Sequence, residues 1–119
     1  MIIHPEGVRE EPQEGRPLVL KRLIHAGEHG PNLSVTWVRI AGHHDRIVNS
    51  VCDRAYYVIE GSGRFQAGDG APVENVSAGD FVFIAHGMPY EFEGEMTYLV
   101  MNSPAFKPGS DRVLPAALP

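Results

Sequence analysis

Two glycine-bounded segments of this 119-residue chain, each with its own regular spacing of marker positions, constrain the fold more than any other feature. The marker positions of the first segment are Gly42, Val48, Ser50, Arg54 and Gly61, separated by five, one, three and six residues. The marker positions of the second segment are Gly79, Ala85, Gly87, Tyr90 and Gly94, separated by five, one, two and three residues. Short apolar runs between glycines are typical of strands joined by turns.

The remaining sequence also favours short strands. Its 13 glycines and 10 prolines suit tight turns better than long helices, and no useful 3.6-residue period is present. The sequence therefore predicts an all-β sandwich or barrel. Residues 60–63 and 94–95 are expected to be turns, residues 42–46 a loop, and residues 68–70 (Gly-Asp-Gly) a hairpin turn. Strands are predicted at residues 18–24, 33–41, 47–51, 54–59, 64–67, 72–76, 81–84, 90–93 and 97–102.

Composition sets the domain organisation and excludes several functions. We expect a flexible arm over residues 1–16, one barrel over residues 17–102 and a proline-rich tail over residues 103–119 that packs on the barrel or on a partner. The net charge of −5 argues against a nucleic-acid partner. One cysteine, the lack of a signal-like start and the lack of a long apolar run predict a cytoplasmic protein with no membrane contact.

Both glycine-bounded segments resemble the paired signatures of the cupin superfamily. In that family the first reads Gly, five residues, His-x-His, three residues, Glu, six residues, Gly. The second reads Gly, five residues, Pro-x-Gly, two residues, His, three residues, Asn. The runs YYVIEGSGRF (residues 56–65) and SAGDFVFIAHGMPYEF (residues 77–92) also look like cupin sequence. The resemblance implies a double-stranded β-helix, which is a jelly-roll barrel.

The positions that hold metal ligands in cupins are occupied by other residues in this chain. Val48 and Ser50 stand at the two histidines of the first signature, Arg54 at its glutamate and Tyr90 at the histidine of the second. Transition metals need imidazole, thiolate or carboxylate ligands, and a fixed positive charge repels a cation. We therefore expect no metal ion and no other cofactor.

The resemblance also implies which side chains face the barrel interior. Cupin ligands point inward, so the four replaced positions should do the same, and the period-two alternation of strands adds three neighbours. The result is an apolar and aromatic cup suited to a small molecule. Its predicted lining is Val48, Ser50, Arg54, Tyr56, Val58, Tyr90 and Phe92.

Arg54 is the most informative residue of this lining. A buried guanidinium keeps its proton and needs a partner. That partner is either an anionic group of a ligand or an internal carboxylate such as Asp53, Glu60 or Glu91, unless Arg54 extends to the barrel mouth. Because the strands of the two segments place no acidic residue inward, we expect a bound anion or ordered water at Arg54, with Tyr90 as a second donor.

Tyr90 and His86 are the candidate catalytic residues. A cation such as Arg54 can lower the pKa of a phenol, so Tyr90 or Tyr56 could transfer protons, although both suit a core equally well. His86 follows Ala85 in a turn, where it either exchanges protons near the barrel mouth or is simply exposed. His44 is expected in a solvated loop.

Three functions are compatible with these features. The first is a metal-independent isomerase, epimerase, cyclase or lyase that acts on a small anionic or polar substrate. The second is a non-catalytic cupin that binds or senses a small molecule. The third is a metal-dependent, dioxygenase-like cupin with non-standard ligands. We further expect a homodimer in which the arm or the tail crosses to the partner, because sheet edges need to be covered.

Overall fold

Antiparallel strands dominate the computed structural model, which describes all 119 residues. The strands are β1 (Glu11–Pro12), β2 (Leu18–Ile24), β3 (Ser34–Asn49), β4 (Asp53–Ala67), β5 (Val73–Ser77), β6 (Phe81–Ile84), β7 (Tyr90–Ser103) and β8 (Asp111–Val113). The helical elements are the 3₁₀ turn η1 (Pro5–Gly7) and the four-residue α1 (Ala26–His29). Neither has the length or apolar content that a membrane-crossing helix needs. The all-β prediction is confirmed.

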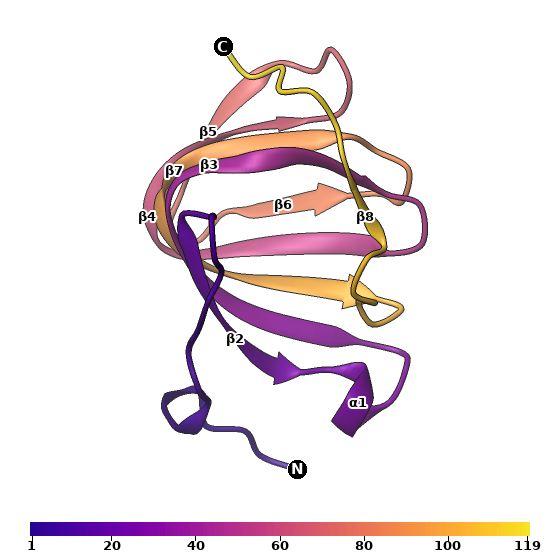
Figure 1. The fold of residues 1–119 in the computed structure, drawn as a ribbon. Coiled ribbons are helices and arrows are strands. Elements are labelled where there is room, and N and C mark those ends of the chain that lie inside the picture. The colour runs from indigo at the N-terminus through magenta and orange to yellow at the C-terminus, as the bar shows by residue number, and fades with distance from the viewer.

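Three long strands, β3, β7 and β4, form the centre of one eight-stranded sheet that curves into a barrel (Figure 1). The pairing order is β1-β2-β3-β7-β4-β5. Strand β6 pairs with the first part of β4, and β5 pairs with the last part. Strand β8 pairs with the end of β3. The long strands therefore curve around a shared interior, as a double-stranded β-helix requires.

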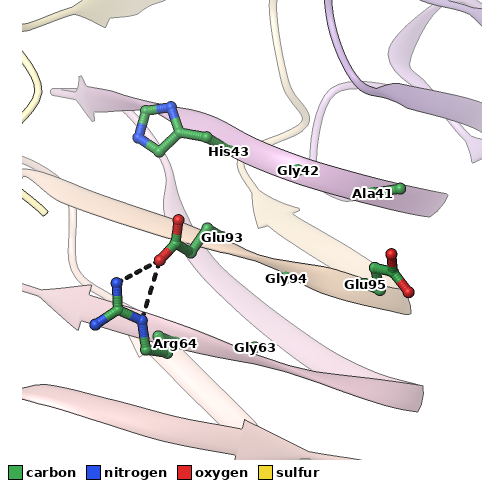
Figure 2. Close-up of a pocket in the computed structure, with 8 residues that line it drawn as sticks. All are labelled: Ala41, Gly42, His43, Gly63, Arg64, Glu93, Gly94 and Glu95. Carbon is green, nitrogen blue, oxygen red and sulfur yellow. Dashed lines mark hydrogen bonds and ion pairs between the residues drawn. The ribbon is translucent and has the colours of Figure 1, made fainter. Parts of the chain in front are cut away.

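A row of glycines lies where the long strands bend. Gly42 on β3 pairs with Gly94 on β7, which pairs in turn with Gly63 on β4, and Figure 2 shows the three side by side. A Cβ on Gly63 would lie 2.5 Å from the carbonyl oxygen of Glu93, so only glycine permits this approach.

The predicted loop at residues 42–46 and the predicted turns at residues 60–63 and 94–95 are therefore wrong. All three stretches lie inside continuous strands. The glycines that looked like turn signals are the points at which long strands bend. The strands predicted at residues 18–24 and 81–84 are confirmed with the same bounds, and those at 33–41, 54–59 and 97–102 fall within or nearly within β3, β4 and β7.

Aromatic rings fill the centre of the barrel. Phe92 is fully buried and stacks on Phe65 at 4.3 Å and on His44 at 4.4 Å between ring centroids. Val58 is also fully buried, and Val48 is 8% exposed. Val58 and Phe92 belong to the core cluster inside the barrel, as expected, whereas its member on this part of β3 is Ile47 rather than the adjacent Val48.

Both terminal regions contact their own barrel. Strand β1, within the N-terminal residues 1–16, pairs with β2, and β8, within the C-terminal residues 103–119, pairs with β3. Further along the tail, the backbone N–H groups of Ala117 and Leu118 donate to the Glu91 carboxylate at 2.8 and 2.7 Å. In Figure 1 this C-terminal segment, in yellow, runs along one side of the barrel.

The close packing at the bend of the long strands predicts how much a glycine-to-alanine substitution lowers the stability of the protein. Gly61 has φ +82°, and a Cβ there would lie 2.7 Å from the Cα of Met96, whereas Gly79 has φ +94° with nothing within 4 Å. Both changes to alanine carry the strain of a positive φ, about 1–2 kcal/mol, but only Gly61→Ala adds a backbone overlap. We expect urea denaturation to show a loss at least about 1–3 kcal/mol larger for Gly61→Ala than for Gly79→Ala. Equal losses would contradict this account of the bend.

Candidate functional site

A cavity of about 110 Å³ lies inside the barrel. Its walls come from β2, β3, β4 and β7, and the C-terminal segment closes one side. The lining residues are Leu18, Thr36, Val38, His44, Arg54, Tyr56, Tyr98, Val100, Asn102, Phe106 and Asp111. This mixture of apolar walls and a few convergent polar groups is typical of small-ligand sites.

A second depression lies outside the barrel, over the glycine row (Figure 2). It measures about 480 Å³, but it is a shallow groove open to solvent. Of the charged side chains around it, Arg64 is paired with Glu93 and His43 with the buried Glu91, while Glu95 is exposed. Apolar walls combined with convergent buried polar groups are found in the interior cavity, so we take that cavity as the candidate site.

Arg54 is held by the protein itself. It is 5% exposed. Its Nη1 donates to the Tyr90 hydroxyl at 2.7 Å, its Nε donates to Asn102, and its Nη2 donates to Asp111 at 3.1 Å. The expectation that a bound anion or ordered water must neutralise Arg54 is therefore wrong. The carboxylate comes from β8 in the tail rather than from the strands of the two glycine-bounded segments.

Asp111 is itself fixed in place by Asn49 at the end of β3. The Asn49 side chain donates to Asp111 at 2.9 Å and accepts the backbone N–H groups of Val51 and Cys52. On the same side, the ring of Phe106 lies 5.8 Å from the Arg54 guanidinium carbon. The C-terminal segment thus supplies both an ionic and an aromatic contact to the buried cation.

Two phenols continue the network away from Arg54. The Tyr56 and Tyr90 hydroxyl oxygens are 2.6 Å apart. A guanidinium only donates, so Tyr90 accepts from Arg54. Between the two hydroxyls either oxygen can be the donor, and the pair has no other protein acceptor. One O–H of the pair is therefore left without a protein acceptor, and Tyr56 is the member that lines the cavity.

Burial keeps both phenols protonated. It raises the pKa of Tyr90 above the ordinary phenol value, despite the opposing effects of Arg54 and of hydrogen bonds. Burial also raises the pKa of Tyr56, and the neighbouring Tyr90 adds to this rise. Arg54 does lower both phenol pKa values, but desolvation outweighs the cation, so the net lowering expected from the sequence is wrong. At neutral pH both phenols therefore carry their protons.

His44 supplies an acceptor nitrogen to the same cavity. It lies on β3, is 8% exposed and lines the cavity, so its expected place in a solvated loop is wrong. Its Nδ1 donates to the carbonyl of Asp45 at 2.7 Å, which leaves Nε2 without a proton in the neutral ring. No protein group bonds to Nε2. Burial lowers the pKa of His44 to about 4, although the bond to Asp45 opposes the shift.

The structure brings together some of the predicted site residues and separates others. Arg54, Tyr56 and Tyr90 form one network. Ser50 does not line the barrel, because the chain leaves β3 at Asn49 and Ser50 lies exposed in the following turn. His86 is also outside the cavity. It is exposed and bonds through Nδ1 to Asp53 at 2.8 Å.

Sequence reasoning missed several lining residues, and the signals for them differ. His44 follows Ile40 and Gly42 at intervals of two, so an unbroken strand would have placed it inward. The same alternation links Tyr98 and Asn102 on β7. Phe106 and Asp111 lie in an irregular, proline-rich segment with no period that could indicate their position. The residues so missed are His44, Tyr98, Asn102, Phe106 and Asp111.

The interior does not fit the metal centre of most cupins. Val48 is apolar, Arg54 carries a fixed positive charge within 2.7 Å of the Tyr90 hydroxyl, and His44 is the one imidazole in the cavity lining. A divalent cation would lack ligands and would be repelled. Three potential ligands do approach within 4.8 Å of one another elsewhere, at and just before α1, outside the cavity. These are His25, Glu28 and His29.

Burial of neutral His44 predicts a pH-dependent stability. The pKa of His44 is about 4 in the folded protein and about 6.5, the ordinary histidine value, in the unfolded chain. Between these two pH values the unfolded chain therefore binds more protons than the folded protein. Stability is therefore lost as the pH falls through this window, by about 3 kcal/mol at pH 4.

The His44→Gln variant should lack this component. We expect urea denaturation from pH 7 to pH 4 to show wild type losing about 3 kcal/mol more than the variant. Parallel losses in the two proteins would mean that His44 is not buried in its neutral form. Acidic groups with shifted pKa values are common to both proteins and cancel in the comparison.

Comparison with known proteins gives matches at the level of structure. No family profile and no curated protein sequence matches the chain. The nucleoside dehydratase Pac13 of Streptomyces is 19% identical with a TM-score of 0.79, over 96% of this chain and 90% of that one. The polyketide cyclase RemF of Streptomyces resistomycificus is 20% identical with a TM-score of 0.77, over 98% and 87%. KdgF of a Halomonas species is 15% identical with a TM-score of 0.75, over 90% and 96%.

These likenesses extend over nearly the whole of each chain, and all are to barrels of one type. At such low identity they establish the architecture alone. Together with the glycine row and the strand order, they show that the chain has a double-stranded β-helix fold, a jelly-roll barrel.

Proposed function

We propose that this protein is a metal-independent lyase that removes water from a small polar substrate by acid–base catalysis in the barrel cavity. One observation carries the proposal. A proton acceptor, Nε2 of His44, and a hydroxyl group, that of Tyr56, line the same cavity; Nε2 has no partner in the protein, and the Tyr56 hydroxyl has Tyr90 as its one partner. General acid–base catalysis needs such a pair.

His44 takes the role of the base. Its Nε2 accepts a proton from a carbon that is acidified by an adjacent carbonyl group. With a pKa of about 4 the ring is neutral throughout the physiological range, so the acceptor is always available. The bond from Nδ1 to the Asp45 carbonyl fixes the tautomer and stabilises the imidazolium that forms during the transfer.

Tyr56 takes the role of the acid. It protonates the departing hydroxyl group, so that the C–H and C–O bonds break, a C=C bond forms and water leaves. The phenolate left on Tyr56 accepts the Tyr90 hydroxyl, which is in turn polarised by Arg54. The proton held on His44 then returns to Tyr56, which restores both groups.

The charge and size of the cavity limit the substrate. Asp111 already neutralises Arg54, so the proposed ligand is uncharged at this point rather than anionic. A volume of about 110 Å³ is below the several hundred cubic ångströms of most ligand pockets. The reacting end of the substrate therefore fits inside, and a larger remainder has to pass Phe106 and Asp111.

The comparisons support this class of chemistry. Pac13 is a nucleoside dehydratase, and solved variants of it, with tyrosine replaced by phenylalanine or histidine by glutamine, hold uridine. RemF is a cyclase. The cavity of this protein presents the same residue types, two linked tyrosines and one histidine. We therefore propose nucleosides and other hydroxyl-bearing carbonyl compounds as the first substrates to test.

The competing function is ligand binding without turnover. The depressed pKa of His44 makes it a weak base, which would suit a group that only accepts a hydrogen bond. Incubation with a panel of uridine, its oxidised 5′-aldehyde and small β-hydroxy carbonyl compounds separates the two. Loss of water detected by mass spectrometry supports the lyase, whereas a thermal shift with no change in mass supports the binding protein.

Removal of either transferring group should abolish turnover and spare binding. We expect His44→Gln and Tyr56→Phe each to lower kcat by about 10²–10⁴-fold, while the ligand-induced thermal shift persists. The matched control is Tyr57→Phe, since this neighbour lies on the opposite face of β4. Full activity in Tyr56→Phe would refute the assignment of the acid.

A further inference from the structure

A single turn of helix joins β2 to β3 at the edge of the barrel and carries side chains of the types that bind transition metals. This turn is α1, which Figure 1 shows beyond the end of β2. Gly30, with φ +92°, ends the turn, and Pro31 follows it. The backbone N–H of His29 donates to the carbonyl of His25 at 2.8 Å. The turn is therefore a short link, closed by its own hydrogen bonds, between two paired strands.

His25, Glu28 and His29 gather on one side of this turn. Each offers one ligand atom, and the three atoms all lie within 4.8 Å of one another. No other group of three histidine, cysteine or acidic side chains in the chain comes this close. Their spacing explains the arrangement, since residues three and four positions apart are neighbours on a helical turn. The cluster lies outside the barrel cavity, so the proposed lyase chemistry does not use it.

The distances within the cluster approach those of a tetrahedral zinc site. With metal–ligand bonds of about 2.0–2.2 Å, two ligand atoms of such a site lie about 3.4 Å apart. Nε2 of His25 and Oε2 of Glu28 are already 3.4 Å apart. The rings of His25 and His29 meet edge to face, with their centroids 5.3 Å apart. All three side chains are exposed or half-exposed, so small rotations close the remaining gap.

His29 has one hydrogen bond that a metal ion would replace. Its Nδ1 accepts the backbone N–H of His25 at 3.1 Å, which orients the ring. A metal bound at either ring nitrogen gives up this bond, because Nδ1 then carries either the metal or the proton. One neutral hydrogen bond at the surface is a small loss against three metal–ligand bonds.

We propose that His25, Glu28 and His29 bind one divalent transition-metal ion, with zinc as the expected occupant. Two imidazoles and one carboxylate are one of the three-residue sets that bind zinc, and they leave the fourth position to water. The imidazoles favour zinc, copper and nickel over magnesium and calcium, which prefer oxygen ligands. The net charge of −5 also attracts cations to the protein.

A bound ion also stabilises the edge of the cavity. The loop after α1 holds the C-terminal segment, because the Pro31 carbonyl accepts the backbone N–H of Ala105 and Ser34 Oγ accepts that of Phe106, both at 2.9 Å. Phe106 lines the cavity. A metal ion that fixes α1 therefore has a structural role, and its binding to the folded chain raises the melting temperature.

Calorimetric titration of metal-free protein with zinc chloride tests the site. We expect one zinc ion per chain for wild type and a melting temperature that rises with added zinc. His25→Gln, Glu28→Gln and His29→Gln should each weaken zinc binding by about tenfold or more. The matched control is His86→Gln, because exposed His86 has a single carboxylate, that of Asp53, beside it. This control should bind zinc as wild type does.

Cobalt(II) and magnesium test the geometry and the class of metal. Cobalt(II) should bind with the visible absorption of a four-coordinate site, and magnesium chloride should not bind. A wild-type protein that binds no zinc, or that binds it no better than His25→Gln and His29→Gln do, would overturn the proposal. Magnesium bound as tightly as zinc would also overturn it. Because the cluster lies outside the cavity, none of these results depends on whether the protein turns over a substrate.

Discussion

The close approach of three strands at Gly42, Gly94 and Gly63 is the constraint on which the rest of the structure depends. Without side chains at these points, β3, β7 and β4 bend and remain paired with one another on both sides of the bend. Each strand therefore contributes residues to two walls of one interior. On β3, for example, Val38 and His44 lie on either side of the bend and both line the cavity.

The bent strands create an interior in which polar groups have to satisfy one another. A charged Arg54 in such a place is stable only with partners, and Tyr90, Asn102 and Asp111 provide them. The chain of hydrogen bonds that begins at Arg54 ends at the Tyr56 hydroxyl. The cation that the barrel has to neutralise is thus also the group that orients the proposed acid.

The sequence was sufficient for the fold and for part of the site. The resemblance to cupins implied that Arg54 and Tyr90 face the interior, and strand alternation added Tyr56; all three are buried. Glycine was the source of the main errors, since a glycine at a turn and a glycine at a strand bend look alike. Reading Gly42 as part of a loop removed His44 from the cavity. Asp111 and Phe106 could not be predicted. They lie in the C-terminal segment, whose sequence has no strand or helix period to show which residues approach Arg54.

The protonation state of His44 is the central claim and can be measured without a substrate. Nitrogen-15 NMR of the imidazole rings distinguishes the two neutral tautomers and the imidazolium. The structure predicts that His44 is neutral at pH 7 with its proton on Nδ1, and that it titrates near pH 4. A ring that is protonated at pH 7, or that carries its proton on Nε2, would remove the proposed base from the cavity and contradict the account.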